Sequence, residues 1–293
     1  MDMNQTTQKA YAKINLGLDV LRRREDGYHE VKMIMQTVDI CDDLVFQRTA
    51  QPGIRIETDN GELPTDQNNL IYKAADLLMR ERGIAEGVRI MLTKRIPIAA
   101  GMAGGSSDAA ATMRGLNRLF DMGYSTEDLQ KLGVKLGADI PYCIVGGTML
   151  SEGIGEILSP LPSPPDCYLV VAKPDINVST RFVYENLHAD SLTVHPDIDG
   201  MMEAIRAGSL QGMTDRLGNV LETVTIREYP VIEEIKETLR REGARNALMS
   251  GSGPTVFGIY ADQDKAKQAA LQIERRKMAK QVFVTTFQDN IDR

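Results

Sequence analysis

The chain has 293 residues, of which 42% are hydrophobic and 26% are charged, as expected for a soluble globular protein with one large or two ordinary domains. Its net charge of −7 argues against a nucleic-acid-binding protein, because such a protein normally carries a basic surface. An acidic surface also repels anions, so a phosphorylated ligand would need a locally positive pocket.

Cysteine content and the amino-terminal segment favour a cytoplasmic protein. Cys41, Cys143 and Cys167 are odd in number and widely spaced, which indicates neither a disulfide framework nor a zinc site. Residues 1–17 are polar and lack the apolar core of a signal peptide. No apolar stretch approaches the length of a membrane span. We therefore expect a cytoplasmic protein with reduced thiols and no membrane partner.

Residues 11–20 alternate strictly between apolar and polar side chains, which predicts a half-buried strand. Lys13, Asn15, Gly17 and Asp19 fall on the polar face, so they are expected to point away from the core. Further strands are expected at 29–40, 43–48 and 54–58, after a turn at Asp26-Gly27.

The next segments indicate helices. Apolar residues recur at helical spacing over 69–82, where Gly83 is the expected stop. After a strand at 88–93 and a glycine loop at 97–107, a second helix is expected to run to about Phe120. Ser125 and Asp128 have the spacing of a capping box for a third helix that ends at Gly137.

Prolines at 160–165 mark a linker between a domain of residues 1–160 and a domain of residues 166–293. The first domain reads as a mixed sheet with helices, and the second as an antiparallel sheet backed by helices, which together make an α+β fold. In the second domain we expect strands at 167–173, before and after a glycine turn at 251–253, and at 281–287, and helices near 179–187, 198–207, 230–242 and 263–278.

The segment at 97–110, PIAAGMAGGSSDAA, has the properties of a phosphate-binding loop. Glycines let backbone approach a ligand closely, and successive N–H groups before a helix N-terminus attract anions. It is not a Walker A loop, because no Gly-Lys-Ser/Thr closes it. The alternative interpretation is a glycine-rich turn capped by Ser107 or Asp108. A second glycine turn, MSGSGP at 249–254, is by itself more typical of a tight hairpin.

Three segments together resemble the GHMP kinases: the early strand carrying Lys13, the glycine loop, and the late SGSGPT turn. The finer pattern AYAKINLGLDV, REDGYHEV, IPIAAGMAGGSSDAAA and LGADIPYCIVGG resembles the branch whose substrate is a cytidine-diphosphate-linked methylerythritol, in the same order along the chain. The resemblance implies a two-domain α+β fold with the active site in the cleft. It also implies transfer of the γ-phosphoryl group of ATP, with Mg²⁺, to the 2-hydroxyl of that small molecule, in the non-mevalonate route to isoprenoid precursors.

The resemblance assigns Lys13 and Asp139 as catalytic residues. Lys13 would stabilise the alkoxide as it forms, and Asp139 would accept the proton of the substrate. By composition alone, Lys13 reads as a solvated strand residue and Asp139 as the N-cap of a short helix.

Other site residues also follow from the resemblance. Tyr28 would stack on cytosine and His29 would read its edge, with Met35 as the second face; Asn15, Thr180 and Tyr184 would contact the substrate. For Thr180 and Tyr184, a helix cap and a core aromatic are equally good interpretations. The ATP-binding residues implied are Asn69, Lys94, Pro97, Ala100, Gly101, Met102, Ala103, Gly104, Gly105, Ser106 and Ser107. Ser107 is the expected protein contact of the metal, with phosphates and water supplying the remaining ligands.

Two alternative functions stay open. One is another GHMP kinase, acting on homoserine or a mevalonate-type substrate, neither of which has a base for Tyr28 and His29 to bind. The other is a non-catalytic ligand-binding protein on this fold, against which the presence of Lys13 and Asp139 argues. The expected partner is a small molecule rather than nucleic acid, and the chain is expected to be a monomer or a homodimer.

Overall fold

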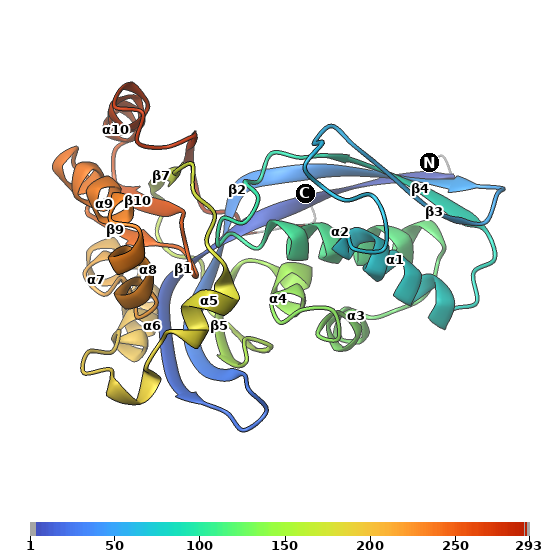
Figure 1. The fold of residues 1–293 in the computed structure, drawn as a ribbon, viewed down its shortest axis with the longest axis horizontal. Coiled ribbons are helices and arrows are strands. Elements are labelled where there is room, and N and C mark those ends of the chain that lie inside the picture. The colour runs from blue at the N-terminus through green and yellow to red at the C-terminus, as the bar shows by residue number, and fades with distance from the viewer. Residues whose placement is uncertain (1–3, 290, 292–293) are drawn as a thin grey trace.

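The computed structural model describes residues 4–289 and 291. The strands of the first sheet are β1 (Gln5–Arg23), β2 (His29–Thr49), β3 (Gly53–Thr58), β4 (Gly87–Thr93), β5 (Thr148–Gly153), β6 (Ile157–Pro160) and β8 (Gly218–Asn219). They form a seven-stranded sheet in the order β3-β4-β2-β1-β8, with β5 paired to β2 and β6 paired to β5 (Figure 1). The β3–β4 and β1–β8 pairs are parallel and the other pairs antiparallel, so the mixed sheet predicted from the sequence is confirmed.

The hairpin of β1 and β2 is longer and more buried than its sequence pattern predicts. β2 is one continuous strand where the pattern indicates two, at 29–40 and 43–48. The prediction of a half-buried β1 is wrong, because both of its faces are buried from Ala10 to Val20. Its apolar residues Ala12, Ile14 and Leu16 share a hydrophobic cluster with the second sheet. The helix at 104–119 packs against the strand as well, so no face of β1 is left to solvent there.

Four helices follow the first strands: α1 (Leu70–Glu81), α2 (Gly104–Leu119), α3 (Thr126–Gly133) and α4 (Ile140–Val145). Asn69 caps α1 by accepting from Ile71 N, and the capping box of Ser125 and Asp128 begins α3 as the sequence predicts. α3 ends at Gly133, four residues before the expected stop at Gly137, because the chain turns into α4 there. A Cβ at Gly133 would lie 2.7 Å from Ile140 Cγ2, so this crossing needs a glycine.

The second sheet is antiparallel throughout, in the order β11-β7-β10-β9. Its strands are β7 (Tyr168–Lys173), β9 (Asn246–Met249), β10 (Val256–Tyr260) and β11 (Gln281–Thr285). The helices around it are α5 (Thr180–Glu185), α6 (Ile198–Arg206), α7 (Leu210–Thr214), α8 (Glu222–Glu228), α9 (Val231–Arg241) and α10 (Gln263–Arg275), with a 3₁₀ turn at Ala189–Ser191. This arrangement confirms the predicted antiparallel sheet backed by helices. The short elements α7, α8, β5 and β6 were not anticipated.

The second half of the chain pairs with the first sheet at both β1 and β2. β8 comes from the second half of the chain yet pairs with β1 at Gly17 and Leu18, and Val38 of β2 forms a bridge with Phe287. Residues 161–167 connect β6 to β7, where the sequence places its linker; the domain boundary at 160–166 stays a prediction. Among the described residues, no helix combines the length and apolarity that a membrane crossing requires.

Candidate active site

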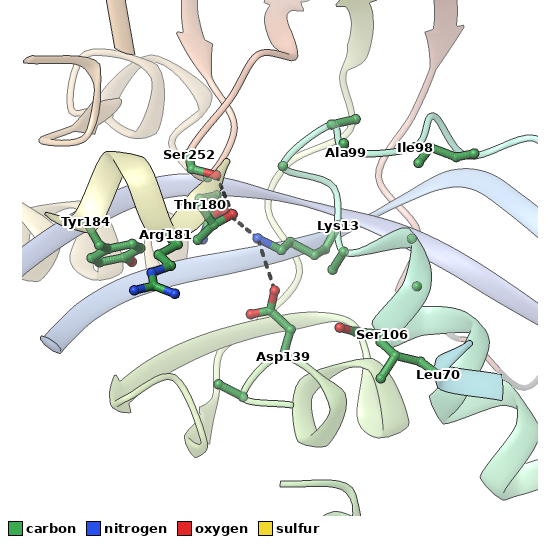
Figure 2. Close-up of a pocket in the computed structure, with 18 of the residues that line it drawn as sticks. Lys13, Leu70, Ile98, Ala99, Ser106, Asp139, Thr180, Arg181, Tyr184 and Ser252 are labelled. Carbon is green, nitrogen blue, oxygen red and sulfur yellow. Dashed lines mark hydrogen bonds and ion pairs between the residues drawn. The ribbon is translucent and has the colours of Figure 1, made fainter. Parts of the chain in front are cut away.

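A cavity of about 870 Å³ lies where the β1–β2 hairpin, the glycine loop, the start of α4 and the start of α5 meet. Figure 2 shows Lys13, Asp139, Thr180 and Ser252 converging on it from these separate segments. The predicted site residues that line it are Lys13, Asn15, Tyr28, His29, Asn69, Lys94, Pro97, Ala100, Gly101, Ala103, Gly104, Gly105, Ser106, Asp139, Thr180 and Tyr184.

The glycine loop has the backbone geometry of an anion-binding nest. Positive φ angles occur at every second residue, 49° at Ala99, 70° at Gly101 and 55° at Ala103. Such alternation turns successive N–H groups toward one side of the chain. α2 begins at Gly104, so its first unpaired N–H groups and the positive end of its dipole face the same space. The loop can therefore hold phosphate groups with backbone alone.

The second glycine turn does more than join two strands. Ser250 Oγ donates a hydrogen bond of 2.9 Å to Gly101 O, which ties this turn to the glycine loop. The side chain of Asn219 donates to Met249 O and Gly251 O and fixes the turn from the other side. A Cβ at Gly101 would lie 2.2 Å from Ser250 O, so only glycine permits this approach. The sequence interpretation of a simple hairpin is thus incomplete.

Lys13 and Asp139 face each other across the cavity, 4.0 Å apart between Nζ and Oδ2. Lys13 is buried, and its ammonium donates to Asn15 Oδ1 at 2.8 Å, which holds it in place. Asp139 stands at the N-cap position of α4 but makes no side-chain cap hydrogen bond. Its carboxylate is 35% exposed and is therefore available to a ligand. The capping interpretation of Asp139 does not hold for its side chain.

Aromatic and imidazole rings gather at the other end of the cavity. The rings of His29 and Tyr184 lie 5.0 Å apart, and Tyr28 is 58% exposed. Burial, and secondarily the charge of Arg23, lowers the pKa of His29 below its ordinary value. A neutral imidazole can both donate and accept a hydrogen bond, as reading a base edge requires.

Lys94 and Asn69 line the cavity, but their side chains have partners within the protein. The ammonium of Lys94 is buried between Asp42 and Asp108, and it lies 3.1 Å from Asp108 Oδ2. Burial raises the pKa of Asp108 to about 8, although Lys94 opposes the shift. Asn69 uses its amide to cap α1 and to donate to Pro64 O. The charge of Lys94 is therefore largely compensated by these carboxylates, and its side chain packs beneath Gly104.

Three predicted site residues do not reach the cavity: Met35, Met102 and Ser107. Met35 pairs with Asn15 but is fully buried in the core. Met102 is buried in the cluster shared with the second sheet. Ser107 is the fourth residue of α2, where its hydroxyl turns inward and donates to Tyr11 O at 2.6 Å. It is Ser106 whose hydroxyl turns toward the cavity (Figure 2).

Several cavity residues escaped the sequence analysis, among them Arg23, Met33, Arg181 and Ser252. Met33 takes the place expected for Met35: it lines the cavity, and Asn15 Nδ2 lies 3.2 Å from its sulfur. A register shift between Asn15 and Gly17 leaves one extra residue, Leu16, in β1. Nothing in the neighbouring sequence indicates that bulge. Ser252 Oγ lies 2.8 Å from Thr180 Oγ1, which supports the assignment of the SGSGPT turn to the site.

The chain is similar to known kinases over nearly its whole length. Residues 69–147 match the GHMP kinases N terminal domain, and residues 195–280 match GHMP kinases C terminal. The chain is 54% identical over 285 residues to the 4-diphosphocytidyl-2-C-methyl-D-erythritol kinase of Lachnoclostridium phytofermentans, covering 97% of this chain and 98% of the relative. It is 34% identical to a crystal structure of 4-(cytidine 5'-diphospho)-2C-methyl-D-erythritol kinase, with a TM-score of 0.83, covering 97% of this chain and all of the other.

A more distant solved structure shares the fold alone. The L. major mevalonate kinase, in complex with R-mevalonate, is 19% identical to this chain with a TM-score of 0.77, over 98% of both chains. At that identity, the likeness shows the architecture and carries nothing about the substrate.

Proposed function

The chain belongs to the GHMP kinases, in the branch of the 4-diphosphocytidyl-2-C-methyl-D-erythritol kinases, and we propose that it transfers the γ-phosphoryl group of ATP to the 2-hydroxyl of 4-diphosphocytidyl-2-C-methyl-D-erythritol. The observation that carries the proposal is one cavity holding both a phosphate-binding loop and the facing pair Lys13 and Asp139. Kinases of this family use ATP as co-substrate. The reaction is a step in the non-mevalonate route to isoprenoid precursors.

Lys13 and Asp139 divide the chemical work. Phosphoryl transfer to an alcohol requires a proton acceptor and compensation for the negative charge that develops on the attacking oxygen. The half-exposed carboxylate of Asp139 is placed to accept the hydroxyl proton. The ammonium of Lys13, held by Asn15, supplies a fixed positive charge beside the same oxygen. Because both are preorganised, little reorganisation is needed during the reaction.

The glycine loop binds the phosphates of ATP. The N–H groups of the nest and the N-terminus of α2 compensate phosphate charge without a Walker A lysine. This matters in a chain with a net charge of −7, because the protein as a whole repels ATP. Lys94 lies beneath Gly104 and supports the loop while paired with Asp42 and Asp108.

Mg²⁺ is proposed to accompany ATP and to be held mostly by phosphate oxygens and water. Within the described residues, no group of three or more His, Cys, Asp or Glu side chains is placed to hold a metal. Mg²⁺ commonly keeps several waters and takes only one or two protein oxygens, so a site of this kind fits it. Ser106 and Asp139 are among the residues that line the cavity and could each offer the metal an oxygen, whereas the hydroxyl of Ser107 donates to Tyr11 O. The metal would neutralise charge on the transferred phosphoryl group.

The two alternatives find less support. A homoserine or mevalonate substrate would leave the ring group of Tyr28, His29 and Tyr184 without a base to bind. A non-catalytic binding protein would have no need of the Lys13–Asp139 pair. The relatives at about half identity carry the name of the cytidyl substrate kinase, which favours neither alternative.

An acceptor comparison tests the proposal. ATP consumption is measured with 4-diphosphocytidyl-2-C-methyl-D-erythritol, homoserine and mevalonate in parallel, and the position of the new phosphate is read by ³¹P NMR. We expect turnover with the cytidyl acceptor alone and phosphate on its 2-hydroxyl. Equal or greater turnover with homoserine or mevalonate, or none with any acceptor, would contradict the proposal. Lys13→Met serves as the inactive reference for contaminating kinases.

A further inference from the structure

The proposed substrate places a diphosphate between its two recognised ends. Its base end belongs with Tyr28 and His29, and its reacting hydroxyl belongs with Lys13 and Asp139. The linking diphosphate carries two negative charges that must be compensated inside an acidic protein. None of the residues assigned so far supplies that charge.

The lysine and arginine side chains lining the cavity are Lys13, Arg23, Lys94 and Arg181. Lys13 faces Asp139, and Lys94 is enclosed by Asp42 and Asp108, so both ammonium groups already have carboxylate partners. The ammonium groups of both lysines are also buried, whereas Arg23 and Arg181 are exposed and can turn their charge toward a ligand.

Arg181 occupies the stretch between the two ends of the cavity. Figure 2 draws its guanidinium between the ring of Tyr184 and the Lys13–Asp139 pair. Within the described residues, Arg181 forms an ion pair with Glu185 at 2.7 Å, one helical turn away. The side chain is 85% exposed, and an exposed pair of this kind contributes little, so Glu185 aims the guanidinium without neutralising it strongly.

Arg23 approaches from a different element. It ends β1, directly opposite His29 on β2. Across the described residues it forms no ion pair, whereas its neighbours Arg22 and Arg24 pair with Glu30 and Asp26. Arg23 and His29 both line the cavity, so their pairing places Arg23 at the base end.

Resting on the proposed function, we propose that Arg181 and Arg23 bind the diphosphate of the substrate, one from α5 and one from β1. A planar guanidinium matches phosphate oxygens with two parallel hydrogen bonds, which a lysine cannot reproduce. The two arginines make the cavity selective for a nucleoside diphosphate over a nucleoside that carries the same base.

The test compares CDP with cytidine in calorimetric titrations, with the ATP site saturated by AMP-PNP. Arg181→Met and Arg23→Met are each expected to weaken CDP binding about tenfold or more and to leave cytidine binding unchanged. Arg181→Lys should recover part of the loss. Arg80→Met is the matched control, because Arg80 is 80% exposed, pairs with Asp76 at 2.7 Å one helical turn away and lies on α1 outside the cavity.

An unchanged ratio of CDP to cytidine affinity in both variants would overturn the assignment. So would an equal loss for both ligands, because it would mean that the arginines only support the base pocket. The ratio is measured without catalysis, so it stands apart from the acceptor assay. A wild-type protein that binds CDP selectively but phosphorylates no cytidyl acceptor would refute the proposed function and leave the arginine assignment supported.

Discussion

Replacing Gly101 by alanine tests the contact between the two glycine segments. The φ angle of Gly101 is 70°, in the region that costs an L-residue about 1–2 kcal/mol. The added Cβ would lie 2.2 Å from Ser250 O, so the segments must move apart. That movement removes the hydrogen bond from Ser250 Oγ to Gly101 O, which contributes about 0.5–1.5 kcal/mol.

We therefore expect Gly101→Ala to lower the free energy of unfolding by about 2–3 kcal/mol. Urea unfolding should show a lower midpoint with an unchanged m-value, since the surface exposed on unfolding stays the same. The KM for ATP should rise as well, because the loop loses its support. Separate titration of AMP-PNP binding by calorimetry distinguishes a weakened nucleotide site from a smaller folded fraction.

Gly105→Ala is the matched control on the same loop. A Cβ there would lie 3.5 Å from Leu70 Cδ1, an ordinary contact, and Gly105 is already in the helix. Alanine at that position should raise the free energy of unfolding by about 0.5–1 kcal/mol. The reasoning fails if Gly101→Ala changes stability by less than about 0.5 kcal/mol, the range of an ordinary surface substitution.

Three further predictions address the chemistry and the base end. Lys13→Met and Asp139→Asn should each lower kcat strongly and leave the affinity for AMP-PNP nearly intact. The double variant should lose less kcat than the two single losses combined, because the residues act as a unit. Full additivity of the two losses would argue for separate roles. Tyr28→Ala should cost about 1–3 kcal/mol of cytidyl-substrate binding and leave the KM for ATP unchanged; equal effects on both substrates would mean a structural role. The folded-state pKa of His29 is lowered below 6.5, so the neutral imidazole that contributes to substrate binding is present above that pH and is lost as the pH falls through the folded-state pKa. The KM for the cytidyl substrate should therefore rise in acid. Arg23→Met should raise the pKa of His29, followed by NMR titration, and shift the rise in KM to higher pH.

Local chemistry in the sequence determined much of this protein. Alternation over 11–20 placed Lys13 and Asn15 together on one strand face, and both line the cavity. The glycine loop was evident because close backbone approach and positive φ leave few residues other than glycine. The Ser125 box was readable because a helix cap depends on neighbours within three residues.

Tertiary structure alone decided which side chains reach the cavity. The register shift after Asn15 reverses the faces of β1, so that Leu18, predicted to be in the apolar row, lines the cavity, while Asp19 pairs with His195 elsewhere. A bulge depends on the partner strand, and a period of two cannot reveal it. Met33 and Met35 lie two residues apart on the same face of β2, and only the packing around the hairpin decided that Met33 lines the cavity while Met35 is buried in the core.

The start of α2 shows the same limit. The sequence places Ser106 and Ser107 side by side and suggested Ser107 as the metal contact, but the helix begins at Gly104 and turns the two in different directions, Ser106 toward the cavity and Ser107 toward Tyr11. Arg181 and Ser252 became cavity residues only because α5 and the second glycine turn fold back onto β1 from far along the chain. Residue types and spacing set the local chemistry of this chain, whereas long-range packing determined which of those groups meet.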